Sequence, residues 1–265
     1  MVNNSPTSTT SSTLTVMKAR RIPVALYLPN LLGYARVVSA FVGLRCATGR
    51  GSEGSRPGLA ILVWAFSAAL DLFDGILARR LDQCSNFGAN LDVVADNVLR
   101  SATWLAAATG PGCKALASTE AASCVWVPLA AGIFIALEWT TFVLTQLRSA
   151  TEGGAGWKKQ QERSPVWLIS ALFRNNFRNP IGVWAIYGLF SAGALTYASE
   201  TDLRWTVPGF DMFWALAISG RLLSAIVEVW TCCNCMSQVA DGLERMEGNG
   251  EWGIRGGGSS DRRDH

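Results

Sequence analysis

Long apolar runs separated by short polar segments dominate the chain. Six runs, each near the ~20 residues that a helix needs to cross a bilayer, lie at 31–48, 59–79, 90–109, 122–147, 180–198 and 210–233. None alternates apolar and polar residues as a half-buried strand does, so all six are predicted to be helices. Polar loops with Gly or Pro separate them, notably 49–58, 110–121 and 148–165. The pattern predicts an all-α integral membrane protein with six transmembrane helices.

The two ends of the chain differ from this apolar middle. Residues 1–16 are rich in Ser, Thr and Asn and contain no acidic residue, which predicts a disordered segment. The stretch 22–28 follows a basic cluster and is predicted to be a short helix in the membrane interface. Residues 17–240 are assigned to the six-helix domain, and 241–265, Gly-rich from Gly248, to a disordered tail. A Ser-rich, basic start is also typical of an organelle transit peptide, and that alternative stays open.

Composition and charge agree with a membrane protein and indicate its orientation. Only 16% of the residues are charged and 49% are hydrophobic, whereas soluble domains carry about a quarter charged residues. Most Lys and Arg at the ends of the runs or outside them fall on one side, at residues 18–21, Arg79, Arg80, the 148–178 segment and the tail. Because basic residues stay on the cytosolic side, both termini are predicted to be cytosolic.

The residue types present restrict the chemistry. The single histidine, His265, is the last residue, so mechanisms that need a catalytic His or His metal ligands are excluded. The seven cysteines are scattered, with no spacing typical of a disulfide framework or a zinc ribbon. Carboxylates must therefore carry any catalysis.

Four aspartates form the most informative cluster. Asp71 and Asp74 are three residues apart, and Asp92 and Asp96 are four apart, so each pair shares one face of a helix. Residues 80–86 form a polar reversal between the two helices, which predicts antiparallel neighbours with facing acid pairs near the cytosolic end. Four close carboxylates repel one another, and oxygen-only ligands favour Mg²⁺ or Mn²⁺, ions that also bind substrate phosphates.

Two other interpretations of these acids stay open. The aspartates could be ordinary helix ends at the interface, paired with Arg79, Arg80 and Arg100, or they could belong to a metal-binding transporter or scaffold. Further polar residues occur in or near the runs, where such residues tend to face the bundle interior. These are Arg36, Glu138, Arg221 and Glu228, the last two being on one helix face.

Residues 71–96 resemble the signature of the CDP-alcohol phosphatidyltransferase family, D-x-x-D-G-x-x-A-R, eight residues, G-x-x-x-D-x-x-x-D, at every specified position. The resemblance implies the six-helix fold of that family along most of residues 20–240. It also implies transfer of a phosphatidyl group from a CDP-linked lipid to an alcohol, with release of CMP.

The resemblance assigns roles residue by residue. It makes Asp71, Asp74, Asp92 and Asp96 the ligands of two Mg²⁺ or Mn²⁺ ions, and Asp96 also the base that takes the proton of the acceptor hydroxyl. It assigns binding of the CDP-lipid to Asn30, Asp71, Gly75, Ala78, Arg79 and Gly88. Homodimers are common in the family, and a homodimeric state is expected for this chain on that ground alone.

Finer matches concern the acceptor alcohol. Residues 27–36 (YLPNLLGYAR) resemble the opening of eukaryotic phosphatidylinositol synthases, and Val93 stands where glycerophosphate-using relatives have Pro. Those synthases place Arg directly after the fourth Asp, where this chain has Asn97; Arg100 lies one turn on. Asn97, Arg100 and Arg178 are the candidate acceptor residues, although Arg178 fits an interfacial anchor equally well.

The expected substrates are therefore CDP-diacylglycerol and inositol, in the endoplasmic reticulum membrane and among its lipids. Glycerol 3-phosphate or another alcohol is the alternative acceptor, with an organelle membrane as the alternative location. No nucleic-acid partner is expected.

Overall fold

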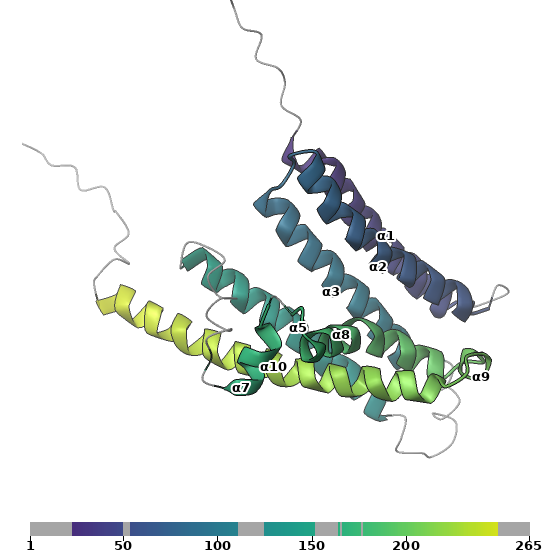
Figure 1. The fold of residues 1–265 in the computed structure, drawn as a ribbon. Helices are drawn as coiled ribbons and strands as arrows, with labels where there is room; N and C mark the ends of the chain where they lie inside the picture. Colours follow the sequence, from purple (N-terminus) through teal and green to yellow (C-terminus); the bar gives the residue numbers. More distant parts are fainter. Residues whose placement is uncertain are drawn as a thin grey trace, which may run out of the picture.

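The structure, a computed structural model, describes residues 23–49, 54–110, 125–151, 164, 166–175 and 177–248. Regular structure in these residues is entirely helical (Figure 1). The elements are the 3-10 helix η1 (Val24–Leu26) and the α-helices α1 (Leu28–Ala47), α2 (Pro57–Arg80), α3 (Asn86–Thr109), α5 (Trp126–Thr151), α7 (Trp167–Phe173), α8 (Pro180–Ser199), α9 (Leu203–Thr206) and α10 (Phe210–Gly248). The all-α prediction is confirmed.

Each of the six predicted runs corresponds to one long helix: α1, α2, α3, α5, α8 and α10. Within the described ranges, four are long and apolar enough to cross a membrane, namely Pro57–Arg80, Trp126–Ser149, Pro180–Ser199 and Phe210–Gln238. The helices α1 and α3 are long enough but are less apolar, because α1 contains Asn30, Arg36 and Arg45, and α3 contains two aspartates and Arg100. The chain thus has the character of an integral membrane protein with four candidate spans.

Two predicted boundaries differ from the structure. Helix α10 continues past residue 233 to Gly248, so residues 241–248, predicted to be disordered tail, are helical. No proline interrupts the sequence from 210 to 248, and the Gly-rich stretch begins only at Gly248, which explains the longer helix. The predicted interfacial helix at 22–28 is a single 3-10 turn, η1, ahead of α1; its place relative to a membrane stays a prediction. Residues 1–16 and 249–265 lie outside the described residues.

Helix α1 is the centre of the first half of the bundle. It packs against both α2 and α3 (Figure 1), while α2 and α3 touch each other far less than either touches α1. The expected direct pairing of α2 with α3 is therefore largely replaced by packing through α1. Helix α3 in turn contacts α5 and α8, and α10 packs on α5 and α8. Helix α3 thus connects the first half of the bundle, α1 and α2, with the second half, α5, α8 and α10.

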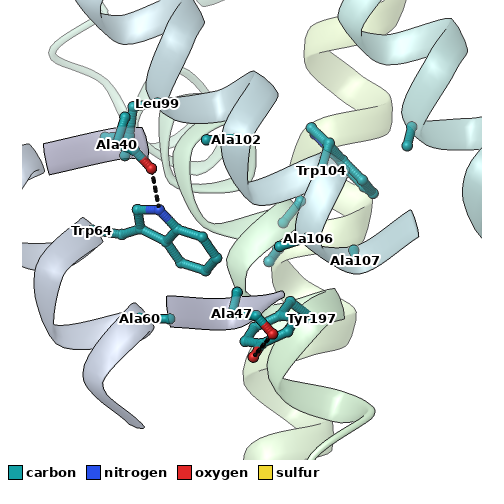
Figure 2. Close-up of a cluster of buried hydrophobic side chains, with 13 residues drawn as sticks. Ala40, Ala47, Ala60, Trp64, Leu99, Ala102, Trp104, Ala106, Ala107 and Tyr197 are labelled. Atoms are coloured by element: carbon teal, nitrogen blue, oxygen red, sulfur yellow. Dashed lines mark hydrogen bonds between the residues drawn. The ribbon is translucent and has the colours of Figure 1, made fainter. Parts of the chain in front are cut away.

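Aromatic side chains of α2 and α8 hydrogen-bond to backbone carbonyls of α1 (Figure 2). Trp64 of α2 donates its indole N–H to the Ala40 carbonyl at 3.2 Å, and Tyr197 of α8 donates its hydroxyl to the Ala47 carbonyl at 3.2 Å. The two rings meet edge to face, 5.6 Å apart. A Cβ on Gly43 would collide with the Trp64 ring, so the close approach requires glycine there. This packing fixes the helix that presents Arg36.

Candidate active site

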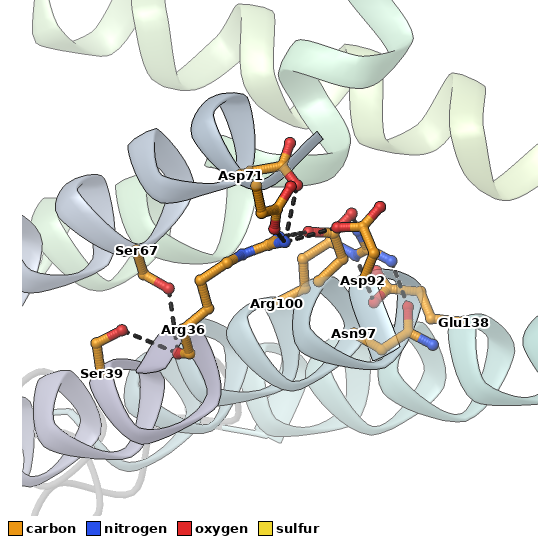
Figure 3. A network of polar contacts seen from close by, with 10 residues as sticks. Arg36, Ser39, Ser67, Asp71, Asp92, Asn97, Arg100 and Glu138 are labelled. Atoms are coloured by element: carbon orange, nitrogen blue, oxygen red, sulfur yellow. Dashed lines mark hydrogen bonds and ion pairs between the residues drawn. The ribbon is translucent and has the colours of Figure 1, made fainter. Parts of the chain in front are cut away.

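The four aspartates come from two helices and meet around one side chain of a third. Asp71 and Asp74 lie on α2, Asp92 and Asp96 lie on α3, and Arg36 reaches them from α1. Figure 3 shows Arg36 directed toward Asp71 and Asp92. One carboxylate oxygen from each of Asp71, Asp74 and Asp92 lies within 4.8 Å of the others. The structure therefore brings the two acid pairs together, as the spacing predicted.

Arg36 is the cation at the centre of this cluster. Its Nη1 lies 2.8 Å from Asp71 Oδ1, 2.9 Å from Asp74 Oδ2 and 2.6 Å from Asp92 Oδ1. Its Nη2 pairs with Asp96 Oδ1. The Arg36 side chain is only 1% exposed, so one buried positive charge faces four negative ones. The excess negative charge makes the cluster a favourable place for further cations.

This arrangement corrects in part the interpretation of the acids as helix ends paired with Arg79, Arg80 and Arg100, because only Arg100 of the three forms an ion pair with them. The ion pairs of the four aspartates in the described residues are formed with Arg36 and Arg100, and Arg79 and Arg80 do not take part. The sequence placed Arg36 in the bundle interior, which is confirmed, but did not assign it to the site. The available signal was an arginine inside an otherwise apolar run.

Local structure explains how α3 presents its two acids. Ser85 caps the helix by accepting a hydrogen bond from the Gly88 N–H at 3.0 Å. Before it, Asp82 has a positive φ of 52°, and the Gln83 N–H donates to the Ala78 carbonyl at 2.9 Å. The chain therefore reverses tightly between α2 and α3, and Asp92 lies about two turns into α3.

A cavity of about 190 Å³ adjoins the carboxylates. Asp74 and Asp92 lie on its wall, and five of the six residues assigned to the CDP-lipid line it: Asn30, Gly75, Ala78, Arg79 and Gly88. The sixth, Asp71, lines a separate, mainly apolar cavity of about 420 Å³ between α2, α3 and α8. The acid cluster therefore adjoins two cavities, one lined by residues of α1, α2 and the start of α3, and one between α2, α3 and α8.

Small residues give the 190 Å³ cavity its shape. A Cβ on Gly88 would lie 2.8 Å from Asn30 Oδ1, and a Cβ on Gly75 would lie 3.5 Å from Arg79 Nη1. Asn30 is itself held by donating its side-chain amide to the Val24 carbonyl at 2.6 Å. Glycine at these positions lets helices and ligand groups approach closely.

Two of the three candidate acceptor residues adjoin the acid cluster. Arg100 Nη1 lies 3.9 Å from Asp96 Oδ2, and Arg100 Nη2 donates to Asn97 Oδ1. Arg178 lies before α8 and is exposed, and its backbone N–H donates to the Asn175 carbonyl at 3.1 Å. The ion pairs around the four acids in the described part of the chain do not include Arg178.

Arg100 begins a buried chain of alternating charges through the second half of the bundle. Its Nε donates to Glu138 Oε2 at 3.1 Å, and Glu138 Oε1 pairs with Arg221 Nη2 at 3.1 Å. Arg221 Nη1 donates to Glu228 Oε2 at 3.0 Å. Arg221 is 0% exposed and lies over the Phe134 ring, 4.2 Å from its centroid. The interior placement expected for Glu138 and Arg221 is confirmed, and Arg221 pairs with Glu228.

A cluster of helix-borne carboxylates beside a cavity lined by small residues is a suitable site for a phosphorylated ligand with divalent ions. Residues 26–193 match the family model described as CDP-alcohol phosphatidyltransferase. The match covers more than half of the chain, so the protein belongs to the CDP-alcohol phosphatidyltransferase family.

Individual relatives are similar to part of the chain. It is 35% identical over 97 residues to the CDP-diacylglycerol–inositol 3-phosphatidyltransferase of Candida albicans, covering 37% of this chain and 40% of that enzyme. Enzyme 1 of that name from Arabidopsis thaliana is 38% identical over 81 residues, or 31% of this chain and 33% of the enzyme. The Homo sapiens enzyme of that name is 38% identical over 76 residues, which cover 28% of this chain and 32% of the enzyme. Each alignment thus spans less than half of the relative. No solved structure matches the chain at a comparable level.

Proposed function

We propose that the protein transfers the phosphatidyl group of CDP-diacylglycerol to inositol, giving phosphatidylinositol and CMP. The observation that carries this proposal is the convergence of Asp71, Asp74, Asp92 and Asp96 beside the cavity lined by Asn30, Gly75 and Gly88. The names of the relatives in Candida albicans, Arabidopsis thaliana and Homo sapiens support inositol as the acceptor.

The donor set fits hard divalent cations. Asp71, Asp74 and Asp92 offer oxygens within 4.8 Å of one another, and Asp96 extends the cluster on the α3 side. These four carboxylates would hold two Mg²⁺ or Mn²⁺ ions, since ligands are oxygen only. When bound, the ions would neutralise the diphosphate and the departing CMP.

On the donor side, the residues of the cavity would bind and orient the CDP head group. Gly75, Ala78 and Gly88 leave room for the nucleotide to approach the helix backbones. Arg79 would place its guanidinium against a phosphate, a pairing that arginine makes well. Asn30, held by the Val24 carbonyl, would form part of the same wall.

On the acceptor side, Asp96 would take the proton of the attacking hydroxyl. The hydroxyl oxygen would bond to phosphorus as the bond between phosphorus and CMP breaks. The Asp96 side chain is 19% exposed and is held by Arg36 through Oδ1. Asn97 and Arg100 would hydrogen-bond other hydroxyls of the acceptor. Alignment of hydroxyl, phosphorus and leaving oxygen, together with charge stabilisation by the bound ions, would supply most of the rate enhancement.

Several features of the whole protein belong to the same proposal. Six membrane crossings with both termini in the cytosol are supported by the six long helices and the distribution of Lys and Arg. The lesser hydropathy of α1 and α3 is compatible with spanning because several of their polar residues, Arg36 and Arg100 among them, are buried in the bundle interior. Residence in the endoplasmic reticulum and a homodimeric state are part of the proposal too.

An acceptor-alcohol assay tests the proposal directly. Membranes containing the protein, CDP-diacylglycerol and Mn²⁺ or Mg²⁺ receive labelled inositol in one reaction and labelled glycerol 3-phosphate in another. Label from inositol is expected in the lipid fraction, with stoichiometric release of CMP. Label from glycerol 3-phosphate in the lipid fraction, without label from inositol, would identify glycerol 3-phosphate as the acceptor. Membranes without the protein are the control.

A further inference from the structure

The acid cluster has two distinct sides. The 190 Å³ cavity is bounded by Asp74 and Asp92 together with residues of α1, α2 and the start of α3, and Asp96, Asn97 and Arg100 are not on its wall. Asp96 instead directs Oδ2 toward Arg100, 3.9 Å from Nη1. In a phosphoryl transfer the attacking and leaving oxygens lie roughly in line across phosphorus. If the nucleotide occupies the cavity, the side of the cluster formed by Asp96 and Arg100 remains available to the attacking alcohol.

Asn97 supplies an independent sign that a polar ligand binds on this second side. The residue is 2% exposed, and its Oδ1 accepts a hydrogen bond from Arg100. Its Nδ2 has no hydrogen-bond partner in the described part of the chain. A buried donor without a partner is costly, and the hydroxyl of a bound alcohol would satisfy it.

Glu138 determines where the Arg100 guanidinium lies. The Glu138 side chain is 1% exposed, and Oε2 accepts the Arg100 Nε–H at 3.1 Å (Figure 3). Its other oxygen pairs with Arg221, which also pairs with Glu228. Arg100 therefore lies between two carboxylates, close to Glu138 and farther, at 3.9 Å, from Asp96.

We propose that Glu138 of α5 is a positioning residue for the acceptor alcohol: by holding Arg100 against Asn97, it keeps Arg100 from closing onto Asp96. The inference rests on the proposed function, in which Asp96, Asn97 and Arg100 form the acceptor side. Without the Glu138 charge, Asp96 is the nearest carboxylate to Arg100, and the guanidinium moves toward it and away from Asn97. The residues that line the CDP-lipid cavity stay in place, since they lie on α1, α2 and the first turns of α3.

Kinetics of Glu138→Gln in the full-length protein test this inference. Glutamine keeps the shape of the side chain and removes its charge. The KM for the alcohol is expected to rise about tenfold, the scale of one hydrogen bond to a charged group, while the KM for CDP-diacylglycerol changes less than about twofold. Glu138→Asp, which keeps the charge on a shorter side chain, is expected to raise the alcohol KM less.

Glu228→Gln is the matched control, because it neutralises a carboxylate of the same charged chain and leaves the Arg100–Glu138 pair in place. Its two KM values are expected to stay within about twofold of wild type, although its thermal midpoint falls. Equal effects of the two Gln variants on the alcohol KM, or an unchanged alcohol KM in Glu138→Gln, overturn the inference. Where Glu138→Gln gives no folded protein, Glu138→Asp takes its place, and an unchanged alcohol KM there overturns the inference as well.

The same experiment separates this inference from the proposed function. Wild-type protein that uses another alcohol in place of inositol overturns the inositol assignment, and the Glu138 comparison is then made with the alcohol it does use. Wild-type protein that transfers the phosphatidyl group to no alcohol overturns both.

Discussion

At the scale of single residues, the site is organised by a buried arginine as much as by its four acids. Arg36 contacts Asp71, Asp74, Asp92 and Asp96 at once, and Arg100 is shared between Asp96 and Glu138. The carboxylates are thus held in fixed positions by protein cations before any substrate arrives. Such fixed charges contribute more to catalysis than mobile ones, because they need not reorganise during the reaction.

Asp96→Asn tests the residue proposed as the base. The amide cannot take the acceptor proton, so kcat is expected to fall by roughly 10²–10⁴, measured as CMP release in detergent micelles. Asp202→Asn, an exposed acid between α8 and α9, is the control and is expected to keep wild-type kcat. Full lipid synthesis by Asp96→Asn would instead favour a metal-binding scaffold or transporter.

Arg36→Met tests the central cation. Loss of the one buried charge that contacts all four acids leaves them to repel one another, and breaking buried pairs of this kind destabilises by about 3–5 kcal/mol. A large fall in the thermal unfolding midpoint is expected, with part of it restored by added Mn²⁺, which supplies positive charge to the same cluster. Arg45→Met, an exposed arginine in the last turn of α1, should unfold near the wild-type temperature. Equal midpoints for the two variants would contradict a central role for Arg36.

At the scale of helices, close packing through small residues decides which side chains meet. Helix α1 approaches α2 at Gly43, where any Cβ would collide with Trp64, and approaches α3 where Asn30 faces Gly88. Helices α8 and α10 cross at Gly188 and Gly220, where a Cβ would collide with the backbone of the opposite helix. Membrane helices pack closely where small residues let their backbones approach.

Gly88→Ala tests the packing of α1 against α3 beside the 190 Å³ cavity. The added Cβ would lie 2.8 Å from Asn30 Oδ1, so Asn30 must move within the cavity wall. The KM for CDP-diacylglycerol is expected to rise several-fold, while the KM for the alcohol changes little. Gly58→Ala near the start of α2, where a Cβ meets nothing within 4 Å, is the matched control and should be neutral or slightly stabilising. Indistinguishable kinetics of the two variants would contradict this view of the cavity.

At the scale of the whole molecule, the site lies where the two halves of the bundle meet. Helices α1 and α2 contribute Arg36, Asp71 and Asp74, and α3 carries its acids on the helix that also contacts α5 and α8. The charged chain from Arg100 through Glu138 to Arg221 connects the site to α5 and α10. Ligands of the acid cluster should therefore stabilise the entire bundle.

Divalent ions provide the test at this scale. Because ions bind the folded cluster and not the unfolded chain, Mg²⁺ or Mn²⁺ at about 100 times the dissociation constant should add about 2.7 kcal/mol of stability. The thermal midpoint of wild-type protein should rise with added ion and return after chelation. Asp92→Asn, which removes one of the three clustered ligands, should lose most of this shift. A shift of equal size in the variant would place the ions elsewhere.

Much of the fold followed from local pattern. The helices α2, α8 and the start of α10 begin close to the predicted residues, because each boundary follows a Gly or Pro signal that acts within a few residues. The end of α10 was wrong, since a polar sequence without proline can continue a helix that tertiary packing has already started. The predicted pairing of α2 with α3 overlooked α1, because loop length alone says nothing of a third helix.

The sequence by itself determined the helical membrane character, the two acid pairs and the family signature, since periodicity and spacing are properties of a few consecutive residues. Only the tertiary structure decided that Arg36 lies among all four acids and that Glu138, from a distant helix, holds Arg100 beside Asn97. Contacts between helices far apart in the chain depend on how close their backbones approach, and that distance is set by packing at glycines such as Gly43 and Gly88.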